Sequence, residues 1–350
     1  RVMRAASPER AVARAAAAWD ATAIVVQSGP RLRALLIAGL DAGRPTAAYL
    51  HNVEWHQVEG TLVPDPAVCF LANSDFSARR WKALCGIDCR IVPPVVRLDA
   101  LPAASAGDRV LFVNPVPVKG VERFFELAAR CPDLGFDMVE NWYLYPSWRD
   151  YCKRRAAALG NVDWFEPTGD MQALYARARV LLMPSVWEEA YGRTVTEAQA
   201  RGIPVLASDR GALREVVGPG GMVLDAHADG DEWVAALRSL HAAPERWAAA
   251  ALGHAAAHVA AAPVIAADLV AVLFEHGLRT GEATMGQPPA QRMLDAGRAA
   301  QARGAYDDAI AAYRDGLARD PDEAIARSLA LHLARLQADT GRWDDAMATM

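Results

Sequence analysis

The chain carries, at residues 181–198, the stretch LLMPSVWEEAYGRTVTEA. Its first residues are apolar and predict a buried strand that ends at Pro184. A loop with Glu189 and Gly192 follows, and a helix is expected to begin at about Thr194. Free backbone N–H groups at this helix start, which Gly192 leaves open to close approach, are typical of an anion site that needs no basic side chain.

Two carboxylates flank this expected helix start. Glu189 and Glu197 have seven residues between them, and we expect both to face the anion pocket, where a carboxylate can accept hydrogen bonds from sugar hydroxyls. Plainer alternatives exist. Thr194 and Glu197 fit a capping box, in which Glu197 only caps the Thr194 backbone. Glu188 and Glu189 fit a solvated loop pair, and Tyr191 fits a core aromatic.

Outward from this stretch, short apolar runs rich in Val, Ile and Leu recur over the first 280 residues, and segments with helical periodicity separate most of them. This alternation predicts parallel strands buried on both faces, which is the doubly wound α/β class. Such sheets bind ligands at the carboxyl ends of their strands. The expected strands are Ala23–Val26, Ala47–Leu50, Val68–Ala72, Arg90–Val92, Val110–Val113, Phe136–Val139, Val180–Met183, Val205–Ala207 and Met222–Leu224, and the expected helices include Val121–Arg130, Asp150–Leu159, Met171–Ala178 and Trp233–His241.

Changes in composition divide the chain. Residues 101–108, LPAASAGD, are small and carry Pro and Gly, as linkers do. A second such segment precedes a region without any strand-like run. The expected parts are a first domain at 1–98, a second domain at 99–280, a linker at 281–290 and a helical tail at 291–350.

The residues of the central stretch occur together with others in a fixed order: Ser185, Glu189-Ala190-Tyr191-Gly192, Glu197-Ala198, Gly202-Ile203-Pro204-Val205, Gly211 and Glu215. This series closely resembles the donor-site signature of the large retaining GT-B glycosyltransferase family, which includes sucrose synthase and the bacterial phosphatidylinositol mannosyltransferases. The two glutamates match its E-x7-E element. The resemblance covers residues 109–225 and implies the GT-B fold of two Rossmann-like domains.

The resemblance also implies roles for individual residues. Glu189 would orient the donor sugar, and Glu197 would hold the ribose hydroxyls. The family's Lys before Gly, which faces the donor diphosphate, is Lys119 here. The family's Arg position holds Asn114, which can donate only a neutral hydrogen bond. Either another cation replaces the arginine, for which Arg193 is the candidate, or donor binding is weaker. The full expected donor-binding set is Asn114, Lys119, Ala190, Tyr191, Gly192, Arg193, Thr194 and Glu197.

In the first domain, residues 48–52, AYLHN, resemble the family strand that ends in an active-site histidine. This makes His51 a catalytic candidate together with Glu189, although a lone histidine at a strand end is more often structural. A departure follows Phe136–Val139, where relatives often have glycines. Here the loop reads ENWYLYP at residues 140–146 and is bulkier.

The implied reaction is transfer of a hexose from a nucleotide-diphosphate sugar, with retention at the anomeric carbon. Lys119 and backbone N–H groups would stabilise the leaving diphosphate, so no metal and no other cofactor is expected. The acceptor, which could be a glycan, a lipid or a protein, is not encoded in any motif of the sequence.

The last sixty residues contain no strand-like run and have the pattern of a helical repeat. The sequence GAYDDA at 304–309 recurs as GRWDDA at 341–346, 37 residues later, near the ~34-residue period of tetratricopeptide repeats. Because the tail resembles that family, it implies an interaction module with a protein partner. One and a half repeats do not form a solenoid alone, and a plain helical hairpin packed on the enzyme is the alternative.

Composition excludes other classes. The net charge of −5 gives no electrostatic basis for binding nucleic acid, and no apolar run reaches the ~20 residues that span a bilayer. The five cysteines follow no metal-ligand spacing and are typical of reduced thiols. We therefore expect a cytoplasmic protein, or one held peripherally at the inner face of the membrane.

Two functions compete on these observations. Glu189, Glu197 and Lys119 favour an active transferase, whereas Asn114 and the short first domain favour an inactive GT-B domain that serves as a binding scaffold. The chain begins and ends within helical sequence, so we expect a piece of a longer protein whose first domain lacks its opening strands. Residues 1–350 are accordingly expected to bind the donor and to transfer sugar poorly.

Overall fold

The computed structural model describes residues 4–54, 57, 58, 62, 65–96, 107–258, 264–273, 275, 289–319, 321 and 323–349. The chain forms two compact units. The first unit comprises Arg1–Asn73, Ser77–Val92 and Ala266–Met350, and the second comprises Ser74–Phe76 and Pro93–Ile265.

The first unit contains a four-stranded parallel sheet in the order β1-β2-β3-β4. The strands are β1 (Ile24–Gln27), β2 (Thr46–Leu50), β3 (Val68–Ala72) and β4 (Arg90–Ile91), connected in part by α2 (Leu32–Asp41) and α3 (Asp75–Cys85), with α1 (Pro8–Ala18) before them. All five residues of β3 are buried, as expected for a central strand covered on both faces. The four strands expected from the apolar runs are confirmed.

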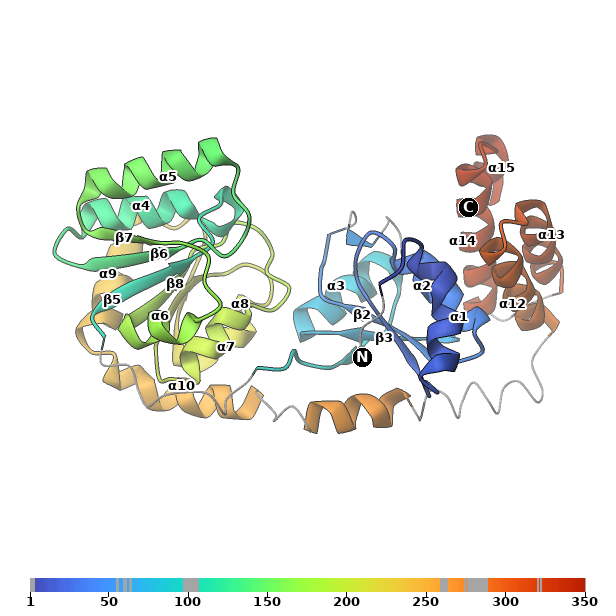
Figure 1. The fold of residues 1–350 in the computed structure, drawn as a ribbon, viewed down its shortest axis with the longest axis horizontal. Helices are drawn as coiled ribbons and strands as arrows, with labels where there is room; N and C mark the ends of the chain where they lie inside the picture. The colour runs from blue at the N-terminus through green and yellow to red at the C-terminus, as the bar shows by residue number, and fades with distance from the viewer. Residues whose placement is uncertain are drawn as a thin grey trace. The chain divides into compact units, whose positions relative to one another are not determined.

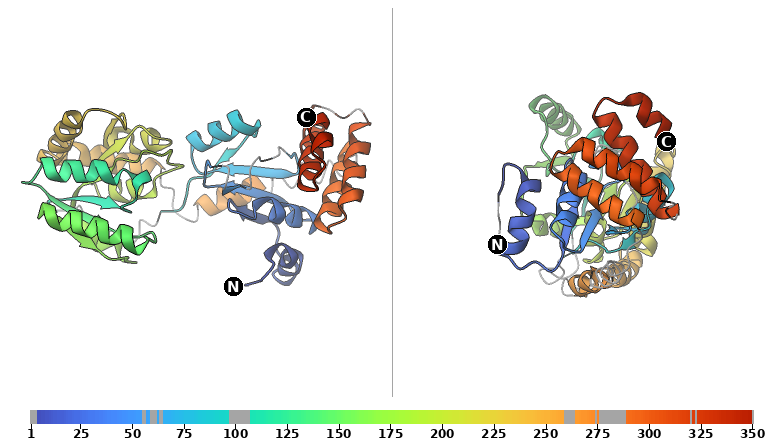
Figure 2. Two further views of the ribbon diagram at one scale, coloured as in Figure 1. Left: turned by 90° about the horizontal axis from the view of Figure 1, so that it is seen from above. Right: turned by 90° about the vertical axis from the view of Figure 1, so that its right-hand side faces the viewer.

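The tail consists of helices that lie side by side within the first unit (Figures 1 and 2). They are α12 (Pro289–Ala302), α13 (Tyr306–Leu317), α14 (Glu323–Asp339) and α15 (Trp343–Thr349). Gly304 and Gly341, the equivalent glycines of the two matching sequences, have φ angles of 77° and 78°, which glycine adopts without steric cost. The structure thus joins the tail to the first unit, whereas the sequence treats it as a part of its own.

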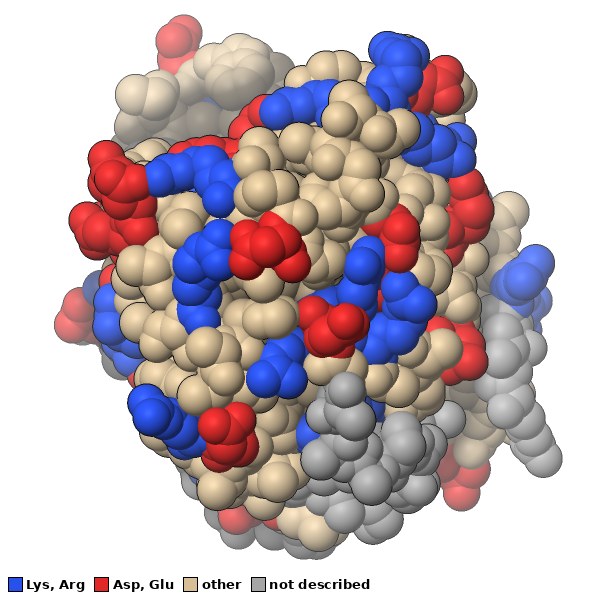
Figure 3. Space-filling view, turned by 90° about the vertical axis from the view of Figure 1, so that its left-hand side faces the viewer, with Lys and Arg blue, Asp and Glu red and all other residues tan. Residues whose placement is uncertain are grey.

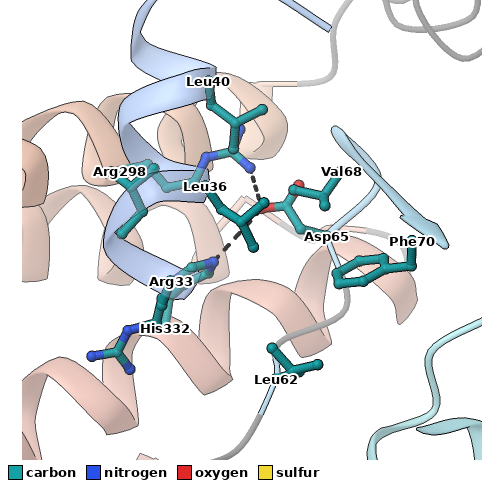
Figure 4. A pocket seen from close by; sticks show the side chains of 10 residues that line it. Arg33, Leu36, Leu40, Leu62, Asp65, Val68, Phe70, Arg298 and His332 are labelled. Carbon is teal, nitrogen blue, oxygen red and sulfur yellow. Dashed lines mark hydrogen bonds and ion pairs between the residues drawn. The ribbon is translucent and has the colours of Figure 1, made fainter. Parts of the chain in front are cut away.

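A buried ionic cluster attaches the tail to the first sheet. The Asp65 carboxylate, just before β3, accepts a hydrogen bond from Arg298 of α12 and lies 3.6 Å from Nε2 of His332 on α14 (Figure 4). Burial raises the pKa of Asp65, but the Arg298 charge and His332 outweigh it and lower the pKa overall. Burial also lowers the pKa of His332. A cavity of about 30 Å³ lies beside these groups, which is room for one water molecule.

The second unit is built on a six-stranded parallel sheet in the order β10-β9-β8-β5-β6-β7. Its strands are β5 (Arg109–Val113), β6 (Gly135–Val139), β7 (Val162–Phe165), β8 (Ala178–Met183), β9 (Val205–Ser208) and β10 (Gly221–Leu224). The chain runs outward from β5 to one edge, then returns beside β5 as β8 and runs to the other edge. The expected doubly wound class is confirmed, and its switch point lies between β5 and β8.

Helices cover both faces of this sheet (Figure 1). Along β5, Val110 and Phe112 join the core under α4 (Val121–Arg130), α5 (Pro146–Leu159) and α9 (Gly230–Ala242). Leu111 and Val113 point to the opposite core, under α6 (Met171–Arg177), α7 (Arg193–Gln199) and α8 (Leu213–Val217). Because alternate residues of one strand enter different cores, the whole strand is apolar, which is the pattern seen in the sequence. Helix α10 (Glu245–His258) follows, and residues 264–273 are helical.

Two surface properties bear on partners. On the face drawn in Figure 3, basic and acidic side chains are interspersed. Among the residues that the structure describes, none of the helices combines the length and the apolar character needed to cross a bilayer.

Candidate functional site

The carboxyl ends of β5 and β8 bring a buried ion pair to the switch point of the second sheet. Lys119, in the short 3₁₀ turn after β5, donates from Nζ to both carboxylate oxygens of Glu189, at 2.6 and 2.8 Å. Ser185, two residues after β8, donates to the Glu189 Oε1 at 2.5 Å. Lys119 is 8% exposed and Glu189 6%. Two residues that the sequence placed in one site thus bind each other.

Glycines allow these two loops to approach. Gly120 has a φ of 79°, and a Cβ there would lie 1.8 Å from the carbonyl oxygen of Pro184. Gly211 has a φ of 63°, and a Cβ there would lie 2.3 Å from the carbonyl oxygen of Glu189. That same oxygen accepts a hydrogen bond from the backbone N–H of Ala212 at 2.8 Å. Glycine is therefore needed at both positions, because a Cβ at either one would collide with the backbone of residues 184–189 that carries Glu189.

Two indole rings flank the Lys119 ammonium. Its Nζ lies 4.7 Å from the ring centre of Trp142 and 5.0 Å from that of Trp187, and the two rings meet edge to face with centres 6.0 Å apart. Trp142 is 43% exposed. Trp142 belongs to the loop after β6 that differs from the family's glycines, so this bulkier loop contributes a wall of the site by cation–π contact.

Asn114 follows β5 directly and has a φ of 65°. Asparagine is one of the few residues besides glycine that tolerates this left-handed conformation. Its side-chain oxygen accepts a hydrogen bond from the backbone N–H of Asn141 at 3.0 Å. The oxygen therefore links the loops after β5 and β6, and the amide nitrogen is the part of Asn114 that can donate to a ligand.

Glu197, on α7, has different partners from Glu189. Its Oε2 accepts a hydrogen bond from the Tyr175 hydroxyl at 2.7 Å, and its Oε1 lies 3.2 Å from Arg193. No side chain caps α7, which begins at Arg193 after Gly192. The capping-box alternative for Thr194 and Glu197 is therefore wrong, because the helix starts one residue earlier and the carboxylate turns to Tyr175.

The remaining expected donor residues lie between the two glutamates. Ala190 is half-buried, and Tyr191 is buried in the core under α7, where burial raises its pKa. Gly192 adopts a φ of 98° just before the helix, and Thr194 donates to the Met183 sulfur at 3.4 Å. Tyr191 is thus a core aromatic, which was the plainer alternative for it. Glu189 is buried and paired with Lys119, so it does not belong to a solvated loop pair.

His51 belongs to the first unit. It follows β2, donates its backbone N–H to Ser28 Oγ at 3.0 Å, and its ring centre lies 4.0 Å from that of Tyr49. At the second sheet the structure brings Lys119 and Glu189 together, whereas Glu197 on α7 has its own partners, Tyr175 and Arg193.

The described part of the chain holds no group of three or more His, Cys, Asp or Glu side chains arranged for a metal ion. The D-x-D sequence Asp229-Gly230-Asp231 begins α9: Asp229 accepts from the Asp231 backbone at 2.7 Å, and Asp231 pairs with Arg130. These carboxylates are accounted for by helix capping and an ion pair.

Three contacts of this site could not be read from the sequence. Tyr175 lies in α6, and its place in the apolar pattern of that helix indicates only that its side chain is buried. Trp142 and Trp187 lie in loops, and nothing in their spacing shows that both meet one lysine. The bulk of residues 140–146 was the only signal that this loop does something different.

Residues 108–254, the segment that holds this site, match the family model "Glycosyl transferases group 1". These residues are therefore similar to the group 1 glycosyl transferases. The chain is 32% identical over 224 residues to the D-inositol 3-phosphate glycosyltransferase of Corynebacterium kroppenstedtii, covering 59% of this chain and 45% of that protein. It is 33% identical over 172 residues to the MMP alpha-(1->4)-mannosyltransferase of Mycolicibacterium hassiacum, covering 45% and 39%. The chain thus spans about half the length, or less, of these curated relatives.

Solved glycosyltransferase structures resemble about three quarters of the chain. Anabaena HepE, in a complex with UDP and glucose, gives a TM-score of 0.64 at 17% identity, covering 76% of this chain and 81% of that one. A glycosyltransferase from Rickettsia africae gives 0.63 at 14% identity, covering 79% and 84%. With two parallel sheets of Rossmann type, the fold is GT-B, as expected.

Proposed function

We propose that the chain binds a nucleotide-diphosphate sugar at the carboxyl edge of the second sheet and belongs to a retaining glycosyltransferase. The observation that carries the proposal is the Lys119–Glu189 pair at the switch point of the segment that matches the group 1 family model. Ligands of doubly wound sheets bind at such a point. The Lys119 ammonium can bind a phosphate there, and the Glu189 carboxylate can accept hydrogen bonds from sugar hydroxyls.

The buried pair changes partners when the donor binds. In the structure the Lys119 charge is neutralised by Glu189. A diphosphate that takes Lys119 would free the Glu189 oxygens, which can then accept hydrogen bonds from the donor sugar. The donor thereby replaces one charge pair by another, and Ser185 keeps the Glu189 carboxylate in place through its hydrogen bond.

The diphosphate carries more charge than one lysine balances. The Asn114 amide adds a neutral donor, and backbone N–H groups near Gly192 add more. Arg193, which begins α7 and has a side chain that is 62% exposed, is the proposed further cation. We expect this set to act without a metal ion, and Glu197 to hold the ribose hydroxyls.

The reaction follows from this placement. Cleavage of the bond between the anomeric carbon and the phosphate oxygen leaves negative charge on the diphosphate, which Lys119 and the donors stabilise. The acceptor oxygen forms the new bond to the anomeric carbon with retention, and its proton passes to the departing phosphate oxygen. His51 is kept as the catalytic candidate that the family resemblance implies. The acceptor stays open, because the relatives act on different ones. The comparisons give the scaffold alternative no support.

Calorimetric titration tests the proposal. UDP, GDP and ADP, each with and without a sugar, are titrated into the protein, starting with UDP because HepE is described in complex with it. One nucleotide is expected to bind below millimolar concentration. Glu197→Gln is expected to weaken binding with or without the sugar, and Glu189→Gln mainly with the sugar. If no nucleotide binds at millimolar concentration, the proposal is refuted.

A further inference from the structure

The buried tyrosine next to the second glutamate has no role in the proposed function so far. Tyr175 is 1% exposed, and its hydroxyl donates to Glu197 Oε2 at 2.7 Å. Burial raises the pKa of Tyr175 far above its usual value, and the Glu197 charge adds to this. The hydroxyl thus keeps its proton and remains a donor.

The hydrogen bond leaves the two oxygens of Glu197 in different surroundings. Oε2 faces the buried Tyr175, whereas Oε1 faces Arg193, whose side chain is 62% exposed. The Glu197 side chain itself is 22% exposed. One oxygen is therefore fixed to the core, and the other is directed to the side from which a ligand can reach it.

A third group fixes the tyrosine. The Arg201 guanidinium lies 4.4 Å from the centre of the Tyr175 ring, and it also donates to the Glu197 carbonyl and to the Gln172 side chain. Arg201 is 4% exposed. Its cation–π contact holds the ring against α7, so that α6 and α7 set the position of one hydroxyl.

We infer that Tyr175 is a positioning residue that orients Glu197 so that its Oε1 accepts a hydrogen bond from a ribose hydroxyl of the nucleotide. This inference rests on the proposed function. Without the Tyr175 hydroxyl, the carboxylate is free to rotate about its last torsion, and part of the preference for ribose over deoxyribose is lost.

The test compares Tyr175→Phe with the wild type by titration. The ligands are whichever of UDP, GDP and ADP binds most tightly, and its 2′-deoxy and 3′-deoxy forms. In the wild type, loss of a hydroxyl bound to a carboxylate is expected to weaken binding about tenfold or more for at least one deoxy form. In Tyr175→Phe this ratio is expected to fall to about threefold or less.

Controls separate orientation from a general structural effect. Tyr151→Phe, which removes another hydroxyl near a carboxylate (Glu122, 3.5 Å) on the same unit, is expected to keep the wild-type ratio. A structural defect would weaken the nucleotide and its deoxy forms alike and leave the ratio unchanged. If Tyr175→Phe does not fold, as judged by thermal unfolding, Arg201→Lys, which loosens the ring, is expected to lower the ratio in the same direction.

The outcomes distinguish this inference from the proposal beneath it. If no nucleotide binds, or if Glu197→Gln keeps the wild-type ratio, the assignment of Glu197 fails. If Glu197→Gln lowers the ratio and neither Tyr175→Phe nor Arg201→Lys does, Glu197 contacts the ribose without help from Tyr175, and the inference is overturned.

Discussion

Replacing Lys119 by methionine should destabilise the second unit even without any ligand. The change leaves the Glu189 carboxylate, whose side chain is 7% exposed, buried and without its cation. Removal of one partner from a buried ion pair typically costs ~3–5 kcal/mol. The hydrogen bond from Ser185 remains and offsets part of the loss, so we expect about 3 kcal/mol.

The double variant Lys119→Met/Glu189→Gln removes both charges at once. Because no charge is then left unpaired, its loss of stability should be clearly smaller than the sum of the two single losses, with a coupling free energy of about 2 kcal/mol. Lys153→Met is the matched control. Its pair with Glu166 has side chains 40% and 63% exposed, so its loss should stay within about 1 kcal/mol.

Amide hydrogen exchange of peptides from β8 and α7 is the suitable measurement, because it reports the opening free energy of this unit separately from the other one. A loss below about 1 kcal/mol for Lys119→Met, or losses that simply add in the double variant, would contradict this expectation. Either one would mean that the two side chains do not form a buried pair in solution.

Three further outcomes are expected. EDTA should leave the affinity for nucleotide unchanged in titration, since Lys119 and neutral donors are proposed to hold the diphosphate; a requirement for Mg²⁺ or Mn²⁺ would contradict this. The tail should detach more readily as the pH falls below about 6.5, the ordinary pKa of histidine. Burial lowers the pKa of His332 in the folded protein, so below this pH the imidazole takes up a proton in the unfolded chain but not in the folded one, and the folded state loses stability. Faster hydrogen exchange in α12 and α14 at pH 5.5 than at pH 7, after correction for intrinsic rates, should be seen in the wild type and be reduced in His332→Gln; equal pH dependence in both would speak against it. Gly120→Ala should weaken nucleotide binding and lower the melting temperature, because its Cβ would collide with the Pro184 carbonyl oxygen; a variant with wild-type affinity would show that the loop adjusts freely.

Elements with a strong local pattern were predictable from the sequence. The run Val121–Arg130 has apolar residues at helical spacing, and α4 occupies those same residues. Each expected strand is found within two residues of its predicted bounds, since a strand buried on both faces is continuously apolar. The helix after Gly192 begins at Arg193, one residue before the expected start.

The partners of the site residues could not be predicted in the same way. Lys119 and Glu189 are seventy positions apart along the chain, and their contact depends on β5 and β8 being neighbours in the sheet. Sequence spacing placed both at strand ends but did not show that they bind each other. Glu197 is the reverse case. The sequence at Thr194 and Glu197 fits a capping box, but in the structure the Glu197 carboxylate accepts a hydrogen bond from Tyr175, a residue distant in the sequence.

The domain organisation depends on contacts of the same kind. The segment 291–350 looks separate because a linker-like sequence precedes it, yet Arg298 and His332 meet Asp65 in the first unit. A buried aspartate in a loop carries no sequence signal for its partners. The protein partner that the repeat resemblance implies for the tail stays a prediction, and it concerns the tail surface that does not contact Asp65.

The central claim is that nucleotide binds at the carboxyl ends of β5 and β8, and the most direct test is a map of hydrogen-exchange protection. Exchange is measured with and without a saturating concentration of the nucleotide that titration identifies. Protection is expected to concentrate in peptides covering residues 113–120 and 185–199, and Lys119→Met is expected to abolish it there. Binding that protects other segments and leaves these two unchanged would contradict this claim.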